Sequence, residues 1–152
     1  MRRTNAAPDM NRFRSVLKSK GLKSTPQRLA VHEAMLSLGH ASVDQVCSWI
    51  AQKGTAEISV ASVYNILSDL SAIGIYRRIP SPGSKTWYDI TTYPHVHIYD
   101  RRKDEFKDLA DPELMGMVNA WYKEHRPKGY RIDDIEVQLI CHPGRRSKKD
   151  TI

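Results

Sequence analysis

The stretch ISVASVYNILSDLSAIGIYRRIPSPGSKTWYDI, residues 58–90, decides the fold of this chain. Its first half has the apolar spacing of one helix face, and that face comprises Val63, Ile66, Leu67, Leu70 and Ile73. After Gly74 the spacing changes to alternation in IYRRI and KTWYDI, which the turn sequence PSPGS separates. The stretch therefore predicts a helix followed by a two-stranded hairpin.

Further helices are predicted ahead of this stretch. A short helix is expected from about Asp9 to Lys20. Thr25-Pro26 then provides a cap and a first-turn proline for the helix PQRLAVHEAMLSL. Ser42-Val43-Asp44-Gln45 has the spacing of a capping box for the next helix. Helices in this order, followed by a hairpin, predict a winged helix-turn-helix domain.

The outer face of the last helix carries small polar groups rather than the Glu and Lys of an ordinary solvated helix. By helical periodicity this face comprises Ala61, Asn65, Ser68 and Ala72, with Tyr64 on its shoulder. Such a face suits insertion into the major groove, where base edges are the partners. Arg77, Arg78 and Lys85 of the hairpin would supply positive charge for phosphate contacts.

The charge distribution is consistent with DNA binding but does not require it. Residues 1–90 carry 12 Lys and Arg against 6 Asp and Glu, whereas residues 91–152 carry 12 against 11. A basic half beside a near-neutral half is typical of a DNA-binding module attached to a regulatory or oligomerising module. A merely solvated basic surface is the alternative that charge alone leaves open.

The second half predicts a smaller α/β unit. HVHIYD and EFKDL have the pattern of strands, DPELMGMVNAW that of a helix and IEVQLIC that of a final strand. So short a unit buries little apolar surface alone, so we expect it to dimerise. The fold class is thus α+β, an N-terminal winged helix-turn-helix domain plus a small C-terminal α/β dimerisation domain. The expected segments are a flexible tail 1–10, the DNA-binding domain 11–90, a hinge 91–94, the dimerisation and sensor domain 95–143 and a basic tail 144–152.

The sequence also limits the location and the metal chemistry. No apolar run approaches the length of a membrane span, and no signal peptide is evident, so a soluble, cytoplasmic protein without a membrane partner is expected. The two cysteines, Cys47 and Cys141, form no C-x-x-C, which excludes a four-cysteine zinc site. His95 and His97 share a strand face, where they are either metal ligands or polar residues on a wet face.

The motifs TPQR, S-x-A-S-VY, a hairpin ending in YDI and H-x-H occur in one order and spacing. In this the chain resembles the ferric uptake regulator (Fur) family from about Gly21 to Cys141. The resemblance implies a dimeric winged-helix repressor whose binding to DNA depends on a metal or a related ligand. Its partners would be a second copy of the chain and a palindromic double-stranded operator.

The resemblance also implies residues for DNA binding. Lys23 matches a lysine that reaches the minor groove, and Tyr64 matches a tyrosine that packs on thymine methyl groups. Where the family commonly has arginine the chain has Asn65, which would pair with adenine or bind phosphate rather than read guanine. The full expected set is Lys23, Ser59, Ser62, Tyr64, Asn65, Arg77 and Lys85.

A regulatory metal site is implied as well. By family position its ligands are His40, Asp89, His95, His97 and Asp108. Three imidazoles with two carboxylates suit Fe(II), Mn(II) or Zn(II). Because Asp89 lies in the first domain and His97 in the second, a bound ion would fix the angle between the domains, and with it the spacing of the recognition helices in a dimer.

The chain departs from the common family pattern at the structural zinc. Asp100, Lys103 and Gly144 replace three of the four cysteines, so a structural four-cysteine zinc is expected to be absent. This loss, with Asn65 after Tyr64, resembles the iron response regulator (Irr) subgroup. That likeness implies haem responsiveness, control of iron and haem homeostasis genes, and a haem-donating protein as a further partner.

Three alternatives remain. Asp108, rather than glutamate, at the last ligand position resembles peroxide-sensing members, so a peroxide- or manganese/iron-sensing repressor of the same family is the nearest. A small metallohydrolase using H-x-H is disfavoured, since H-E-x-x-H, a nucleophile elbow and a glycine-rich phosphate loop are all missing from the sequence. The chain is therefore not expected to be an enzyme. A constitutive architectural DNA-binding protein is the third.

Overall fold

The computed structural model describes residues 7–144, and the chain separates after Tyr93 into two compact units. The expected basic tail lies outside the described residues apart from Gly144, and so does the expected N-terminal tail up to residue 6. Within the tail, Ala7 donates its backbone N–H to the carbonyl of Ile90 at 3.1 Å. No helix among residues 7–144 has the length and apolar character needed to cross a membrane.

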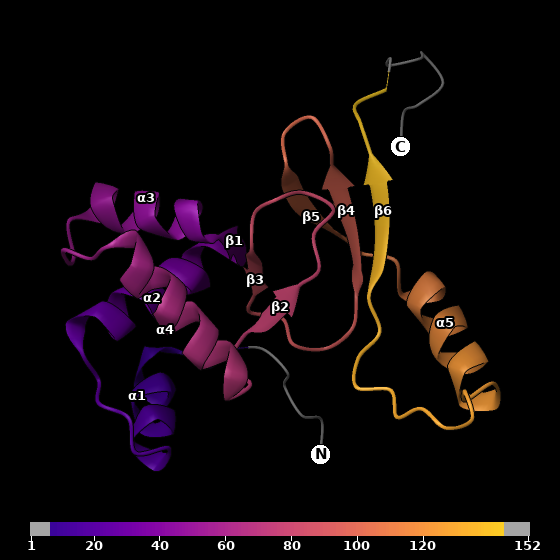
Figure 1. The fold of residues 1–152 in the computed structure, drawn as a ribbon, viewed down its shortest axis with the longest axis horizontal. Helices are drawn as coiled ribbons and strands as arrows, with labels where there is room; N and C mark the ends of the chain where they lie inside the picture. Colours follow the sequence, from indigo (N-terminus) through magenta and orange to yellow (C-terminus); the bar gives the residue numbers. More distant parts are fainter. Residues whose placement is uncertain (1–6, 145–152) are drawn as a thin grey trace. The chain divides into compact units, whose positions relative to one another are not determined.

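Over residues 7–93, four helices build the first unit, as the sequence predicts. They are α1 (Met10–Ser19), α2 (Pro26–Leu38), α3 (Val43–Lys53) and α4 (Val60–Ala72) (Figure 1). Each begins after a residue whose side chain accepts a backbone N–H of the first turn, and these residues are Asp9, Thr25, Ser42 and Ser59. The capping box between Ser42 and Gln45 is complete, with both bonds at 3.3 Å.

A three-stranded antiparallel sheet completes this unit. Its strands are β1 (His40–Ser42), β2 (Arg77–Ile79) and β3 (Trp87–Asp89), in the order β1-β3-β2. β2 and β3 form the predicted wing. β1 was not predicted from the sequence, because three residues between two helices are too short to show alternation.

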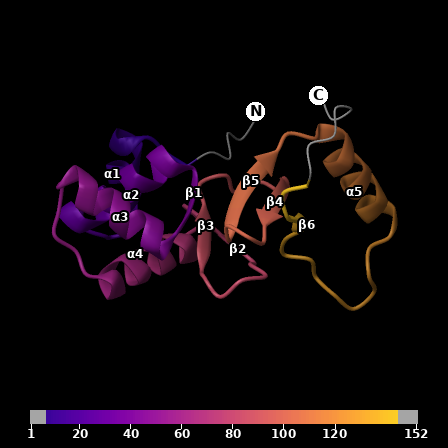
Figure 2. The same cartoon turned by 90° about the horizontal axis from the view of Figure 1, so that it is seen from above.

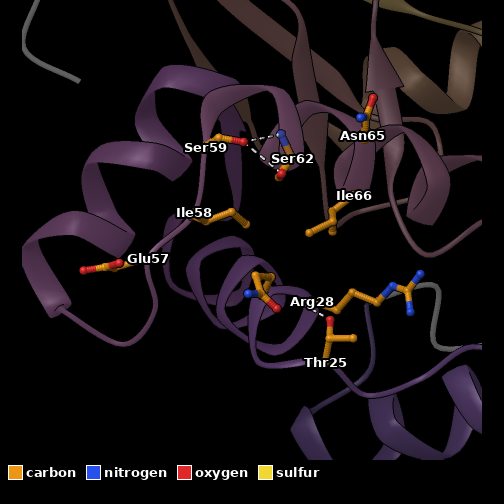
Figure 3. Close-up of a pocket in the computed structure, with 9 residues that line it drawn as sticks. Thr25, Arg28, Glu57, Ile58, Ser59, Ser62, Asn65 and Ile66 are labelled. Atoms are coloured by element: carbon orange, nitrogen blue, oxygen red, sulfur yellow. Dashed lines mark hydrogen bonds between the residues drawn. The ribbon is translucent and has the colours of Figure 1, made fainter.

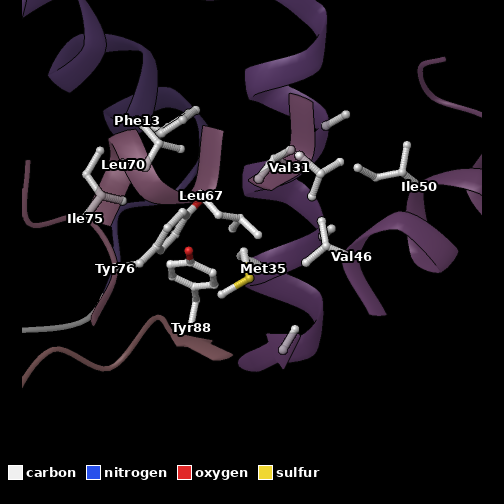
Figure 4. Packing of buried hydrophobic residues seen from close by; sticks show 14 of the residues in the cluster. Phe13, Val31, Met35, Val46, Ile50, Leu67, Leu70, Ile75, Tyr76 and Tyr88 are labelled. Atoms are coloured by element: carbon white, nitrogen blue, oxygen red, sulfur yellow. The ribbon is translucent and has the colours of Figure 1, made fainter. Parts of the chain in front are cut away.

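The core of the first unit lies between its helices and is closed by the wing (Figure 4). Val31 and Met35 of α2 and Leu67 of α4 are fully buried there. His32 also lies in this core, stacked on Phe13 with ring centroids 3.9 Å apart.

Over residues 94–144, the second unit is a three-stranded sheet with one helix. Its elements are β4 (Val96–Asp100), β5 (Glu105–Leu109), α5 (Pro112–Glu124) and β6 (Val137–Cys141). β4 is central, antiparallel to β5 and parallel to β6, and α5 supplies the crossover between β5 and β6 (Figures 1 and 2). The predicted α+β class, with a winged-helix unit followed by a small α/β unit, is confirmed.

Large apolar side chains of the second unit remain on its surface. Met117 and Trp121 of α5 are 64 % and 60 % exposed, one turn apart on the same helix face. Leu139 and Ile140 of β6 are exposed as well. Because Leu139 and Ile140 are consecutive in a strand, they point to opposite faces of the sheet. We therefore call only Met117 and Trp121, which share a helix face, the apolar surface of the second unit.

Candidate metal centre and nucleic-acid interface

Two histidines and an aspartate meet on one face of the second sheet. His97 of β4 lies directly opposite Asp108 of β5, and His95 projects from the same side two residues earlier. The Nε2 atoms of His95 and His97 lie 3.1 Å and 3.4 Å from the same oxygen, Asp108 Oδ1. Within the second unit, the structure therefore brings together the three expected metal ligands that this unit contributes.

The spacing of these atoms fits a divalent metal ion. Two ligands about 2.1 Å from one ion stand about 3.0 Å apart in an octahedral arrangement and about 3.4 Å apart in a tetrahedral one. The separations from Asp108 Oδ1 to the two imidazole nitrogens are of this size, and one ligand atom of each residue lies within 4.8 Å of the others. Imidazole with carboxylate is a donor set for Fe(II), Mn(II) or Zn(II).

His97 is held from several sides. Its side chain is fully buried, and its ring meets the ring of Phe106 edge-on with centroids 5.6 Å apart. Its second nitrogen, Nδ1, lies 2.9 Å from Glu136 Oε1. Sequence reasoning did not find Glu136, since a single glutamate just before the last strand carries no motif. Only the parallel pairing of β6 with β4 brings it near His97.

The other two expected ligands lie together in the first unit. His40 of β1 and Asp89 of β3 are directly opposite each other in the antiparallel ladder. Opposite residues of such a pair project from the same side of the sheet, with Cβ atoms about 4.5–5.5 Å apart. Asp89 also accepts the backbone N–H of Thr91 at 2.8 Å. Of the five expected ligands, two thus come from the first unit and three from the second.

The expected nucleic-acid contacts on α4 are exposed at its N-terminal half. Ser59, Ser62, Tyr64 and Asn65 all face solvent. Ser59 caps the helix by accepting the N–H of Ser62 at 3.1 Å, and the two hydroxyls lie 2.9 Å apart (Figure 3). The capping bonds fix the first turn and so position Tyr64 and Asn65 one turn further along.

Two grooves border this part of α4. The first, of about 380 Å³, is lined by the start of α2 and by Ser59, Ser62 and Asn65 (Figure 3). The second, of about 350 Å³, is lined by Tyr64, Asn65 and the wing residue Lys85. Asn65 lines both grooves.

The basic residues divide by exposure. Lys23, just before α2, and Lys85 of the wing are both exposed. Arg77 is only 8 % exposed, because it points to the covered side of β2, while Arg78 points outward. The phosphate contact expected of Arg77 stays a prediction, and the neighbouring Arg78 is the more exposed of the two wing arginines.

A comparison with known sequences identifies relatives of the chain. Residues 19–140 match the model of the Ferric uptake regulator family. The peroxide-responsive repressor PerR of Staphylococcus saprophyticus is 29 % identical over 99 residues, covering 64 % of this chain and 66 % of that repressor. PerR of Staphylococcus epidermidis is 30 % identical over 99 residues, covering 64 % of this chain and 65 % of that repressor. The match thus spans slightly less than two thirds of the length of these curated relatives.

Solved structures resemble the fold over most of the chain. The Vibrio cholerae ferric uptake regulator aligns with a TM-score of 0.71 at 22 % identity, covering 86 % of this chain and 99 % of its own. The Helicobacter pylori ferric uptake regulator, whose structure revealed three functional metal-binding sites, aligns with a TM-score of 0.68 at 26 % identity. This alignment covers 94 % of this chain and 98 % of the regulator. The Campylobacter jejuni peroxide stress regulator aligns with a TM-score of 0.62 at 27 % identity, covering 88 % of this chain and 97 % of its own.

Proposed function

The chain belongs to the Ferric uptake regulator family, and we propose that it is a homodimeric, metal-responsive repressor of iron and haem homeostasis genes. Members of this family are DNA-binding transcription regulators and not enzymes, which agrees with the prediction that this chain is no enzyme. The observation that carries the proposal is the His95, His97 and Asp108 cluster at metal-ligand spacing, in a chain that also has an exposed polar helix face.

The DNA-binding role is supported by the surface of α4 and its surroundings. In our proposal α4 enters the major groove, Tyr64 packs on thymine methyl groups and Asn65 forms paired hydrogen bonds with adenine. Lys23, which is exposed, reaches the minor groove. Arg78 and Lys85, which are also exposed, contact phosphates and set the register of the helix on the duplex.

The sensing role rests on the two ligand groups. We propose that His95, His97 and Asp108 hold the ion and that His40 and Asp89 complete its coordination. The ion would supply a positive centre that several ligands can bind at once. Because these ligands come from both units, binding them to one ion would restrict the movement of one unit relative to the other. In a dimer, that restriction selects the separation of the two α4 helices, which must match the spacing of operator half-sites.

Dimerisation through the second unit is supported by its apolar surface. Large exposed apolar patches typically mark an interaction site, and aromatic and methionine side chains are enriched in interfaces. Met117 and Trp121 fit this description on α5. A palindromic operator then follows from the two-fold symmetry of the dimer.

The choice of iron and haem as the signal rests on the sequence at the family's structural zinc. Asp100 and Cys141 are paired in register on β4 and β6, so one carboxylate and one thiol remain there. Asp100 Oδ1 accepts the backbone N–H groups of Arg102 and Lys103 at 2.9 Å and 3.2 Å, which makes it a turn-forming residue. A haem-responsive regulator of the Irr kind, supplied by a haem-donating protein, is the finer proposal.

A peroxide-responsive repressor is the second candidate. Two observations favour it, namely that PerR proteins are among the relatives and that Asp108 occupies the last ligand position. In that case His95, His97 or His40 would take up an oxygen atom from peroxide, which is reduced to water, and iron held by these residues would supply the redox chemistry for that step. Mass spectrometry of the iron-loaded protein after peroxide treatment separates the candidates, because only the second predicts an added oxygen on His95, His97 or His40.

The proposed function is tested by DNA-binding titrations at stated salt concentrations. The protein is used metal-free and then with Mn(II), Fe(II) or haem, against genomic fragments upstream of iron and haem genes. We expect sequence-selective binding whose affinity changes with at least one of these ligands. Binding that is equally weak on all fragments under every condition would overturn the proposal.

A further inference from the structure

Glu136 lies beside the candidate metal centre without belonging to the expected ligand set. Its Oε1 atom is 2.9 Å from Nδ1 of His97, and its side chain is 16 % exposed. Oε1 also accepts a hydrogen bond from the side-chain Nε2 of Gln138 at 3.0 Å. Gln138 is directly opposite His97 on β6, so strand pairing sets the position of this acceptor.

The contact decides which nitrogen of His97 can bind a metal. The oxygen of an ionised carboxylate can only accept hydrogen bonds, and Oε1 of Glu136 already accepts one from Gln138. Nδ1 of His97 therefore donates its hydrogen to this oxygen. The hydrogen-bonded nitrogen is thereby occupied, and the lone pair of the neutral ring lies on Nε2. That atom is the one directed at Asp108, 3.4 Å from Oδ1.

The orientation of the ring is constrained in the same way. His97 is fully buried, with the ring of Phe106 edge-on and the ring of His95 at 4.2 Å between centroids. A ring flip would direct Nε2 away from Asp108 and leave a buried N–H without its carboxylate acceptor. Hydrogen bonds from ligand histidines to carboxylates commonly raise ligand basicity and metal affinity.

We propose that Glu136 is a positioning residue of the metal centre, which fixes the tautomer and orientation of His97 so that Nε2 binds the ion. This inference rests on the proposed metal-binding function and extends it by one residue that the family motif does not include. Glu136 acts through His97 and does not itself touch the ion.

The test compares Glu136→Ala with the conservative Glu136→Gln in full-length protein. Glutamine keeps an oxygen that accepts from Nδ1 and loses only the charge, whereas alanine removes the acceptor. Affinity for Zn(II) and Mn(II) is measured by competition with a chromophoric chelator. We expect a loss of about 10- to 100-fold for Glu136→Ala and only a few-fold loss for Glu136→Gln.

A matched control and a spectroscopic readout accompany these measurements. Asp133→Ala removes an exposed carboxylate from the segment that precedes β6, and it should leave the affinity unchanged. In ¹⁵N NMR of the Zn(II)-loaded protein, His97 should keep its proton on Nδ1 and carry the metal on Nε2. Glu136→Gln should preserve this signature. Circular dichroism confirms that each variant is folded.

The outcomes separate this inference from the function on which it rests. If the wild type binds neither ion, the metal function itself is wrong. If the wild type binds and Glu136→Ala binds equally well, only the role of Glu136 is overturned. Equal damage by Glu136→Gln and Glu136→Ala, or metal on Nδ1, would also overturn it, because the carboxylate would then do more than accept a hydrogen bond.

Discussion

His40 and Asp89 lie directly opposite each other on β1 and β3, although α3, α4 and β2 separate them in the sequence. If they share an ion with the second unit, His40→Ala should weaken Mn(II) or Zn(II) binding about 10-fold or more, as should His95→Ala. Competition with a chelator measures both. His125→Ala, which removes an exposed histidine at the end of α5, is the control. Wild-type affinity in His40→Ala would confine the site to the second unit.

Asn65 should determine one base position of the operator. Asn65→Arg is expected to change the preference there from adenine to guanine, by about 1–3 kcal/mol, because arginine pairs with guanine and asparagine with adenine. Binding is measured on a panel of operators that differ at single positions. Asp69→Ala, at an exposed site one turn further along α4, should leave the preference unchanged. An unaltered preference in Asn65→Arg would remove Asn65 from base recognition.

Arg78 and Arg77 should behave differently when substituted. Arg78→Ala is expected to weaken binding to all sequences alike and to lower the salt slope of binding by about 1, since one phosphate contact is lost. Arg77→Ala should instead lower the thermal midpoint, because Arg77 is buried in the wing. Titrations at several salt concentrations and thermal unfolding distinguish the two. A reduced salt slope in Arg77→Ala at unchanged stability would restore the phosphate contact predicted from the sequence.

His32 should make the first unit less stable in mild acid. Its Nε2–H donates to the carbonyl of Pro8 at 2.6 Å, so Nδ1 accepts from the hydroxyl of Tyr76 at 2.7 Å. Burial lowers the pKa of His32 below its ordinary value of 6.5. The unfolded chain therefore takes up the proton first. The stability that neutral His32 provides is complete above pH 6.5 and falls as the pH drops towards the lowered pKa, by up to about 1.4 kcal/mol per pH unit.

Urea unfolding at about pH 7.5, 6.5 and 5.5, which brackets the ordinary histidine pKa, measures this loss. Only the difference between the wild type and His32→Gln counts, because the other histidines contribute equally to both proteins. His125→Gln serves as the exposed-histidine control. The same slope in the wild type and in His32→Gln would exclude His32 as its source.

Trp121 should stabilise the dimer. Trp121→Lys places a charge in the apolar surface of the second unit and is expected to shift the chain towards monomers. Sedimentation at several concentrations measures the dissociation constant. Tyr130→Ser, which removes an aromatic residue that is 78 % exposed outside that surface, should leave it unchanged. Dimers of equal strength in Trp121→Lys would place the interface elsewhere.

The elements with strong local signals could be predicted from the sequence. The caps at Thr25, Ser42 and Ser59 lie where helix starts were expected, because capping depends on residues three positions apart. The wing was predictable from the change of period after Gly74. The resemblance to the family, which rested on motifs such as TPQR, is confirmed by the match over residues 19–140.

What the sequence did not reveal depends on pairing between distant segments. β1 becomes a strand only because β3 lies beside it, and Glu136 meets His97 only because β6 returns parallel to β4. The burial of Arg77 follows from which side of β2 is covered, and neighbouring basic residues in a short strand do not reveal this. The roles of the five expected ligands remain predictions, although three of them lie together in the second unit.

The short strand β1 has a consequence for the order of events during synthesis. Pairing His40 with Asp89 closes a long loop that contains two helices and most of the wing, and its entropic cost is met only when those elements pack. A nascent chain that ends before Trp87 can assemble its helices but cannot place a carboxylate opposite His40. In the proposed sensor, His40 and Asp89 can therefore complete the coordination of the ion only after the DNA-binding unit has folded.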